Sequence, residues 1–235
     1  MLFRSLRAAQ RRRETYVGPW LPEPIITSAD DPDAGESVSM ALLVVLETLS
    51  PLERAVFVLK EAFAFSYAEI ADAVARSEDT VRQAAHRARG HVAARRPRFH
   101  ADRARQRAVT ERFFAAATGG DINTLMGLLA PDVTLWTDGG GKVRHAMRPI
   151  SGAVKIANWL AGVRTKSYEG VSLADMTYEV VELNGGAGIV ISGAGRVIGT
   201  LTVDLDERGL IIGIHNVANP DKLGSITART VHPLS

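Results

Sequence analysis

A chain of 235 residues with 46% hydrophobic content can bury one sizeable core or two smaller ones, and its net charge of +2 is too small to define a partner by itself. The absence of cysteine excludes disulfides, thiolate zinc sites and cysteine nucleophiles, and it favours a cytoplasmic protein. No stretch approaches the roughly 20 apolar residues of a membrane-spanning helix, and the first segment lacks the apolar core of a secretory signal, so no membrane partner is expected.

The segment YVGPWLPEP, residues 16–24, holds three prolines and therefore cannot propagate a helix. Residues 25–37 are small, acidic and turn-forming, which is typical of a solvated linker. A slack linker needs neither Tyr16 nor Trp20. Two interpretations follow: these aromatic residues pack against their own domain, or they form a preorganised contact with another part of the chain.

Four helices are predicted after the linker. Residues 38–49 are rich in leucine and valine and suit a buried helix, and Ser50, Pro51 and Glu53 form a capping-box pattern at the start of the next one. A short helix and a longer basic helix follow, separated by a tight turn. Their predicted inward faces are Tyr67, Ile70, Ala71 and Val74 in the first, and Val81, Ala84, Ala85 and Ala88 in the second.

The positive charge is concentrated around the second of these helices. Between Arg76 and Arg112 the sequence holds eleven arginines and four acidic residues, a net charge of 11 − 4 = +7. From Phe113 onward ten basic residues stand against eleven acidic ones. This division predicts two parts with different tasks, one of which meets a polyanion.

The two helices have the layout of a helix-turn-helix, whose second helix presents donors to phosphates and base edges. Arg82 and Gln83 are the natural base readers, because arginine pairs with guanine and glutamine with adenine. Arg89 is better placed for a phosphate contact. On spacing alone, a basic helix on the surface of an ordinary domain is an equally good interpretation.

Residues 49–89, LSPLERAVFVLKEAFAFSYAEIADAVARSEDTVRQAAHRAR, resemble domain 4 of the extracytoplasmic-function sigma factors, whose helix-turn-helix reads the minus-35 promoter element. The matching residues are the LSP-ER start, EIA in the first helix, and TV with RAR in the second. Ala75 stands where the family's turn usually carries glycine, and Arg76 where an apolar residue is usual. The resemblance implies promoter DNA and core RNA polymerase as partners. The DNA-binding residues that it implies are Thr80, Arg82, Gln83, His86, Arg87 and Arg89.

Sigma factors of this class also carry a domain 2 that holds core polymerase and melts the minus-10 region. Residues 1–14, with LRAAQRRRE, resemble only the last helix of that domain. We therefore expect these 235 residues to bind minus-35 DNA weakly and not to start transcription alone.

From residue 101 the pattern predicts an α+β domain. RQRAVTERFFAAATGGD reads as an amphipathic helix ended by Gly119 and Gly120, and INTLMGLLAPD as a shorter helix ended by Pro131. A further helix is expected near residues 151–163. Strands are expected at VTLW, VRHAMRPI, YEVVELN, GAGIVISG, RVIGTLTVDLD and LIIGIHNVA. This order favours an antiparallel sheet with helices on one face.

Residues 112–142, RFFAAATGGDINTLMGLLAPDVTLWTDGGGK, resemble SnoaL-like domains, which are cone-shaped α+β folds of the nuclear-transport-factor-2-like superfamily with a curved antiparallel sheet. The resemblance implies two domains, an all-α sigma domain 4 and an α+β SnoaL-like domain. The implied boundaries are residues 1–14 for the remnant of domain 2, 15–37 for the linker, 38–100 for sigma domain 4 and 101–235 for the SnoaL-like domain.

Sigma factors with this extension form a subgroup with three further motifs, YVGPWLPEP in the linker, DGGGK at Asp138 to Lys142 and NPDKL at Asn219 to Leu223. DGGGK and NPDKL also have plain structural interpretations, as a glycine turn and as a terminal turn after a strand. The subgroup implies that the SnoaL-like domain regulates the sigma factor in cis. The implied interdomain residues are Tyr16, Trp20, Leu21, Pro22, Asp138, Gly139, Gly140, Gly141, Lys142, Asn219, Pro220, Asp221, Lys222 and Leu223.

SnoaL-like folds include enzymes, so acid–base catalysis has to be weighed. The titratable candidates are Asp138, His145, Asp175 and His215, and nothing in the sequence shows that any pair converges. We expect no enzymatic activity, no cofactor and no metal, and a retained pocket for an unknown small molecule is the stronger hypothesis. Two alternatives stay open: an enzyme or small-molecule sensor tethered to DNA by the helix-turn-helix, and a DNA-binding regulator without sigma activity.

Overall fold

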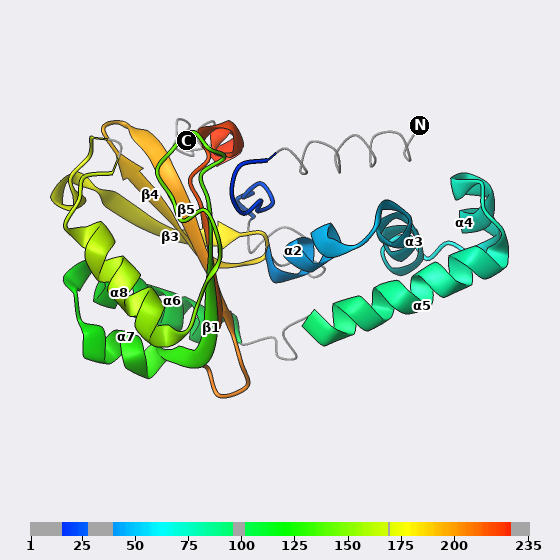
Figure 1. Ribbon diagram of the computed structural model, residues 1–235, viewed down its shortest axis with the longest axis horizontal. Helices are drawn as coiled ribbons and strands as arrows, with labels where there is room; N and C mark the ends of the chain where they lie inside the picture. Colours follow the sequence, from blue (N-terminus) through cyan, green and yellow to red (C-terminus); the bar gives the residue numbers. More distant parts are fainter. Residues whose placement is uncertain (1–15, 28–39, 96–101, 169, 227–235) are drawn as a thin grey trace. The chain divides into compact units, whose positions relative to one another are not determined.

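The computed structural model describes residues 16–27, 40–95, 102–168 and 170–226, which divide into a helical unit and a C-terminal unit (Figure 1). The helical unit contains the described residues 41–95. Residues 16–27, expected as part of an interdomain linker, group with the C-terminal unit. The expected helix of sigma domain 2 at residues 1–14 lies outside the described residues, as does much of the remaining linker.

The described part of the helical unit has four helices, α2 (Met40–Thr48), α3 (Pro51–Glu61), α4 (Tyr67–Val74) and α5 (Glu78–Arg95). The predicted capping box at the start of α3 is confirmed, because the Ser50 side chain accepts from the Glu53 amide and the Glu53 carboxylate accepts from the Ser50 amide. Ser66 and Glu69 form a second box at the start of α4. Each box satisfies backbone N–H groups that a helix start leaves without partners.

The core of this unit forms where α3, α4 and α5 meet. Val56, Ile70 and Val81 are completely buried, and the predicted inward faces of α4 and α5 are confirmed. The turn between α4 and α5 is left-handed at Ala75, with φ 52° and ψ 55°. Ala75 thus adopts the conformation that glycine adopts with the least strain, and its amide closes the helix by donating to the Ala71 and Asp72 carbonyls.

The C-terminal unit begins with two helices, α6 (Arg103–Gly119) and α7 (Ile122–Leu128), followed by the strand β1 (Leu129–Asp138). A short strand β2 (Ile150–Ser151) and the helix α8 (Ala153–Arg164) come next. The sheet is completed by β3 (Thr177–Leu183), β4 (Gly186–Gly193), β5 (Arg196–Leu205) and β6 (Ile211–Val217). Single-turn helices η2 (Leu173–Asp175) and η3 (Pro220–Lys222) lie before β3 and after β6.

The sheet has the order β2-β1-β6-β5-β4-β3. Most neighbours are antiparallel, but β1 and β6 run parallel, with Leu135 opposite Ile214. The α+β fold class is confirmed, and the sheet, which was expected to be antiparallel, is mostly so but contains this one parallel pair. The physical reason is that the chain returns from β5 through a tight turn and places β6 between β5 and β1, the first long strand of the sheet.

Two local predictions differ from the structure. INTLMGLLAPD was expected to stay helical up to Pro131, but α7 ends at Leu128, and Pro131 lies in β1 where the register with β6 shifts. Proline lacks a backbone donor, so it fits a strand only at such an irregularity. VRHAMRPI was expected to be a strand, but only Ile150 is in one, since the chain leaves the sheet after Asp138 through a glycine turn.

Helices α6 and α8 cover one face of the sheet (Figure 1). Phe113 of α6 and Ile156 of α8 are completely buried there against strand residues such as Leu135 and Ile214. Among the described residues, no helix has the length and apolar character needed to cross a membrane.

Candidate functional site

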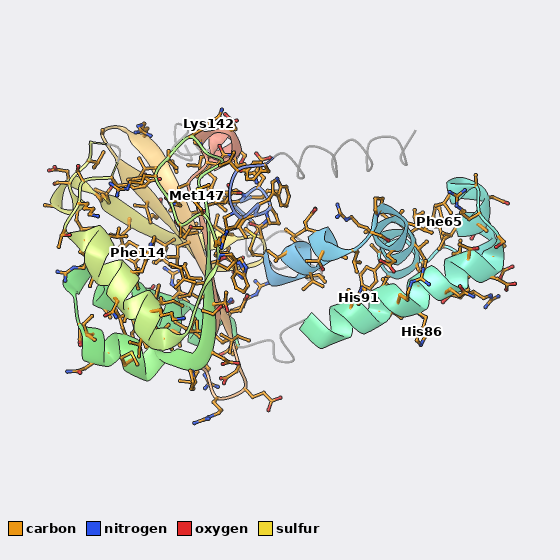
Figure 2. All side chains as sticks on the ribbon, in the orientation of Figure 1. Phe65, His86, His91, Phe114, Lys142 and Met147 are labelled. Carbon is orange, nitrogen blue, oxygen red and sulfur yellow. The ribbon has the colours of Figure 1, made fainter. Side chains whose placement is uncertain are left out.

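The outer face of α5 carries the residues predicted to contact DNA. Val81, Ala84 and Ala88 fix the opposite face in the core, so Arg82, Gln83 and His86 are exposed. Figure 2 shows His86 projecting away from α3. Thr80 lies in the first turn of α5, where its hydroxyl is 2.8 Å from that of Ser77.

Three of the predicted DNA-binding arginines also hold the helical unit together. Arg87 pairs with Glu53 at 2.9 Å, and Glu53 is only 7% exposed. Burial alone would raise the pKa of Glu53, but hydrogen bonds from Arg87 and Ser50 outweigh it and lower that pKa.

The other two arginines both contact Tyr67 of α4. Arg89 pairs with Glu61 and donates to the Tyr67 hydroxyl. Arg82 pairs with Glu78, and its guanidinium lies 4.8 Å from the centre of the Tyr67 ring. A DNA contact by any of these arginines therefore has to share or replace an existing partner.

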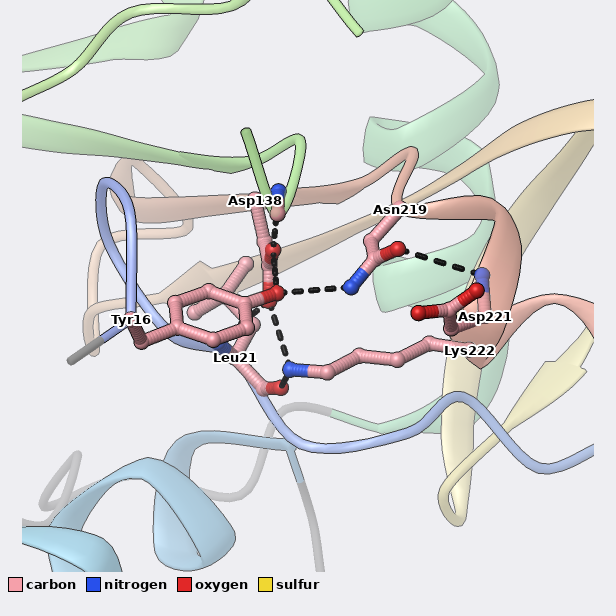
Figure 3. Close-up of polar contacts among 7 residues, drawn as sticks. Tyr16, Leu21, Asp138, Asn219, Asp221 and Lys222 are labelled. Atoms are coloured by element: carbon pink, nitrogen blue, oxygen red, sulfur yellow. Dashed lines mark hydrogen bonds and ion pairs between the residues drawn. The ribbon is translucent and has the colours of Figure 1, made fainter. Parts of the chain in front are cut away.

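A second cluster of predicted residues gathers around the carboxylate of Asp138, at the end of β1 (Figure 3). This side chain is completely buried. One oxygen accepts from the Tyr16 hydroxyl at 2.5 Å and from the Gly140 amide at 3.1 Å. The other accepts from the Leu21 amide at 2.8 Å and from the Lys222 ammonium at 2.7 Å. Four donors therefore compensate the buried charge, and two of them come from residues 16–27.

Lys222 extends this cluster towards the aromatic residues of the linker. Its ammonium also donates to the Leu21 carbonyl, and it lies 3.9 Å from the centre of the Trp20 ring and 4.9 Å from that of Tyr16. The face of an aromatic ring attracts a cation electrostatically, so both rings stabilise the Lys222 ammonium in this position. Burial and the hydrogen bond to Asp138 raise the pKa of Tyr16, which keeps its hydroxyl a donor.

The turn from Asp138 to Lys142 and the motif from Asn219 to Leu223 meet at the same place. The buried Asn219 donates to the Tyr16 hydroxyl at 2.7 Å, and its side-chain oxygen caps η3 by accepting from Asp221. Lys142 reaches both Asp221 carboxylate oxygens at 2.6 Å, on the exposed side of the cluster (Figure 2). We call the assembly of Tyr16, Trp20, Leu21, Asp138, Asn219 and Lys222 the linker clasp.

Close approach explains the three consecutive glycines of the turn. A Cβ at Gly140 would lie 2.4 Å from the Asn219 amide nitrogen, and one at Gly141 would lie 2.9 Å from Cβ of Val17. Both glycines also have positive φ, at 61° and 72°. A Cβ at Gly139 would lie 2.8 Å from the Val143 carbonyl. The turn is therefore shaped by its contacts with the linker and with the chain after β6.

The remaining predicted residues support the clasp by packing. Leu21 is 1% exposed and Leu223 4%, and Pro22 is buried. Pro220 occupies the first position of η3, where a missing amide proton costs no helical hydrogen bond.

A second anchor of residues 16–27, not predicted from the sequence, lies at the turn after β3. Asn184 is 5% exposed, has φ 50°, accepts from the Ile25 amide at 3.2 Å and donates to the Glu23 carbonyl at 3.3 Å. Ile26 forms an isolated antiparallel bridge with Leu183. The only sequence signal was the pair Asn184–Gly185, which also fits an ordinary hairpin turn.

The four candidate catalytic residues do not come together. Asp138 belongs to the linker clasp, and Asp175 is exposed in η2. His215 pairs with Asp204 at 2.7 Å and stacks on Trp136, whereas His145 lines a cavity between the helices and the sheet. No group of three or more histidine, aspartate or glutamate side chains suited to a metal ion occurs within the described ranges.

This chain is similar to one protein-family model, to a curated relative and to solved structures. A family model described as sigma-70, region 4, matches residues 39–92. The extracytoplasmic-function RNA polymerase sigma factor SigJ of Mycobacterium tuberculosis is 36% identical over 231 residues, covering 93% of this chain and 73% of the relative. The crystal structure of the M. tuberculosis sigma factor SigJ matches with a TM-score of 0.72 and 32% identity, covering 93% of this chain and 79% of that one. A SnoaL-like protein of unknown function from Burkholderia thailandensis covers 50% of this chain and 97% of its own, with 12% identity and a TM-score of 0.36.

The helix-turn-helix and the region-4 match define a DNA-binding transcription factor. The chain belongs to the extracytoplasmic-function RNA polymerase sigma factor family, whose members are transcription factors and not enzymes.

Proposed function

We propose that α5 reads the minus-35 element of promoter DNA in complex with core RNA polymerase, and that the linker clasp regulates this activity in cis. Family membership and the region-4 match support the first part. The exposed face of α5, with its amide, imidazole and guanidinium donors, is suited to the major groove.

Within the DNA-binding set, Gln83 and His86 are the leading base readers. Both are exposed and project from a helix whose opposite face is fixed in the core. Arg82 can join them if its guanidinium exchanges Glu78 for a guanine edge. Arg87 and Arg89 are better suited to hold α5 against α3 and α4 and to contribute positive charge near the phosphates.

The observation that carries the regulatory part is the buried Asp138 carboxylate, whose four donors include the Tyr16 hydroxyl and the Leu21 amide. Breaking any one of these contacts leaves a buried charge less well compensated, so the clasp is expected to open as a unit. While the clasp is closed, residues 16–27 stay bound to the C-terminal unit. When it is open, this part of the linker can move independently and change how the DNA-reading helices meet a promoter.

A polypeptide of these 235 residues is expected to bind minus-35 DNA weakly and not to start transcription alone. Promoter-specific initiation by core polymerase with this polypeptide would contradict that expectation. Binding and initiation can be measured on the same duplexes, after selection of preferred sequences from a random pool by the polypeptide itself.

The regulatory part is tested by comparing Tyr16→Phe with Tyr178→Phe. The first removes the hydroxyl bound to Asp138 and Asn219, and the second removes a tyrosine hydroxyl from an exposed residue of β3. Lys222→Met has its matched control in Lys155→Met, on the exposed side of α8. The readout is the affinity of the polymerase complex for the selected duplexes.

The two clasp variants should shift this affinity in the same direction by at least about threefold, while the two controls leave it unchanged. Clasp variants that fold normally and behave like their controls would show that the clasp only packs the linker.

A further inference from the structure

The hairpin turn after β3 contains the dipeptide Asn184–Gly185, the one place in the sequence where glycine follows asparagine. Both residues have positive φ, at 50° and 74°, as a two-residue turn between Leu183 of β3 and Gly186 of β4 requires. Glycine has no side chain, so its backbone nitrogen is the least hindered of any residue. Next to an asparagine, such a nitrogen is well placed to attack the side-chain amide carbon within the same chain.

The linker binds both partners of that attack. The Gly185 amide donates to the Thr27 hydroxyl at 3.1 Å. The Asn184 side chain accepts from the Ile25 amide at 3.2 Å and donates to the Glu23 carbonyl at 3.3 Å. The Asn184 backbone amide donates to the Ile25 carbonyl at 2.8 Å, and only 5% of the residue is exposed. The docked linker therefore covers the nucleophile and the group that it would attack.

We propose that Asn184 is a site of deamidation, and that docking of linker residues 23–27 controls the rate. In this reaction the Gly185 nitrogen loses its proton to a base in the solvent and forms a bond with Cγ of Asn184. The Cγ–Nδ2 bond breaks, ammonia leaves, and a five-membered cyclic imide remains. Water then opens the imide at either carbonyl and yields aspartate or isoaspartate at position 184. Water is the co-reactant, and nothing is oxidised or reduced.

The docked linker slows the first step of this reaction. Attack requires the Asn184 side chain to turn its Cγ towards the Gly185 nitrogen, and the two side-chain hydrogen bonds to the linker oppose that rotation. The hydrogen that must be removed from Gly185 is bound to the Thr27 hydroxyl. The reaction therefore proceeds from the undocked form, and its rate follows the fraction of time that residues 23–27 spend undocked.

The product does not fit the docked linker. A carboxylate at position 184 keeps an acceptor for the Ile25 amide, but an anionic oxygen replaces the Nδ2 donor that lies 3.3 Å from the Glu23 carbonyl. Two acceptors without a shared hydrogen then face each other in a buried position, which destabilises the contact. Isoaspartate also adds a methylene group to the backbone of a two-residue turn. Deamidation thus makes the release of this part of the linker permanent.

This anchor and the linker clasp hold consecutive parts of one segment. Tyr16 and Leu21 are bound to Asp138, and the contacts to Asn184 begin directly after them, at Glu23. Opening of the clasp therefore removes one of the two restraints on the residues that cover Asn184. The modification site stands on the contacts of residues 23–27 alone. That a deamidated chain has an altered affinity for promoter DNA rests on the regulatory function proposed above.

The rate is tested by ageing the full chain at mildly alkaline pH and mapping its peptides by mass spectrometry. Thr27→Val removes the hydroxyl bound to the Gly185 amide, and its matched control, Thr177→Val, removes an exposed hydroxyl at the other end of β3. Conversion of Asn184 should be at least about fivefold faster in Thr27→Val than in wild type, while Thr177→Val leaves the rate unchanged. Wild type unfolded in guanidinium chloride gives the rate of the uncovered dipeptide.

An Asn184 that stays unconverted in the unfolded chain would overturn the modification site. Folded wild type that reacts as fast as the unfolded chain would overturn control by the linker, as would equal rates in the two threonine variants.

The consequence for docking is tested with Asn184→Asp, which reproduces the aspartate product, and with Asn158→Asp on the exposed side of α8 as control. The Thr27 amide donates to the Glu182 carbonyl at 3.0 Å and reports on docking. Its hydrogen exchange should be at least about tenfold faster in Asn184→Asp and unchanged in Asn158→Asp. An unchanged rate in Asn184→Asp would overturn the permanent release. The promoter affinity of Tyr16→Phe is measured on fresh protein, so failure of the regulatory function gives a different result.

Discussion

The ammonium of Lys222 lies 2.7 Å from a carboxylate oxygen of Asp138, and the Asp138 side chain has no exposure to solvent. A few residues away, Lys142 pairs with Asp221 at 2.6 Å, but both of those side chains are more than half exposed. The same pair of residue types thus occurs twice in one cluster, once buried and once in water.

This contrast predicts very different costs for the two lysines. Lys222→Met should lower the free energy of unfolding of the C-terminal unit by about 3 kcal/mol, because it leaves a buried carboxylate without its cation. Lys142→Met should cost less than about 1 kcal/mol. Urea unfolding followed by tryptophan fluorescence reports on this unit alone, since Trp20, Trp136 and Trp159 all belong to it. Equal losses in the free energy of unfolding for the two variants would mean that water reaches the Asp138 carboxylate.

Tyr16 gives the clasp a dependence on alkaline pH. Its pKa is raised in the folded chain by burial and by Asp138, so the neutral hydroxyl is the form that the fold stabilises. This stabilisation is fully present below the ordinary tyrosine pKa of about 10, and it is lost as pH rises above that value towards the folded pKa. Wild type should therefore lose stability more steeply than Tyr16→Phe above about pH 10 in urea unfolding at a series of pH values. Parallel curves would show that the hydroxyl is not held as a donor to Asp138.

The close contacts of the glycine turn can be tested by comparing alanine at Gly140, within the turn, with alanine at Gly195, in the turn between β4 and β5. Both glycines have positive φ. Gly195→Ala meets no atom within 4 Å, so it should cost only the strain of a left-handed alanine, about 1 kcal/mol. Gly140→Ala would bring its Cβ to 2.4 Å from Asn219 and should cost clearly more, on the order of 3 kcal/mol. The same urea experiment measures both. Similar losses for the two variants would contradict the close approach of Asn219 to the turn.

The residues of α5 should separate into structural and DNA-reading ones. Arg87→Ala leaves the buried Glu53 carboxylate without its partner and should destabilise the helical unit by about 1 to 3 kcal/mol, measured by hydrogen exchange of α3 amides. Gln83→Ala should leave that exchange unchanged and weaken binding to the preferred duplex by about fivefold or more, with relaxed preference at one base. If Gln83→Ala weakens binding equally on all sequences, the residue is a phosphate contact.

The local structure was predictable wherever neighbouring residues determine it. The capping box of Ser50 and Glu53, the inward faces of α4 and α5, and the helix end at Gly120 all follow from patterns a few residues long. The parallel pairing of β1 with β6 was not predictable, because it joins strands about 80 residues apart and depends on the order in which the sheet is assembled.

In the candidate site, too, local motifs were predictable from the sequence and long-range contacts were not. Motifs identified Tyr16, Asp138 and Asn219 as residues of interest, but only the fold shows that one carboxylate accepts from both the linker and Lys222. Asn184 was missed because a buried anchor and an ordinary turn residue look alike in sequence. The structural role of Arg87 depends on the burial of Glu53, which lies 34 residues away.

The most direct measurement of the linker clasp is the hydrogen-exchange rate of the Leu21 amide, which donates to the buried Asp138 carboxylate at 2.8 Å. In the wild-type chain this amide should be protected to a degree similar to that of strand amides in β6. In Tyr16→Phe its protection should fall at least about tenfold, while Ile214 keeps its own and Tyr178→Phe changes neither. A Leu21 amide that exchanges in the wild-type chain as fast as an unstructured peptide would contradict the clasp.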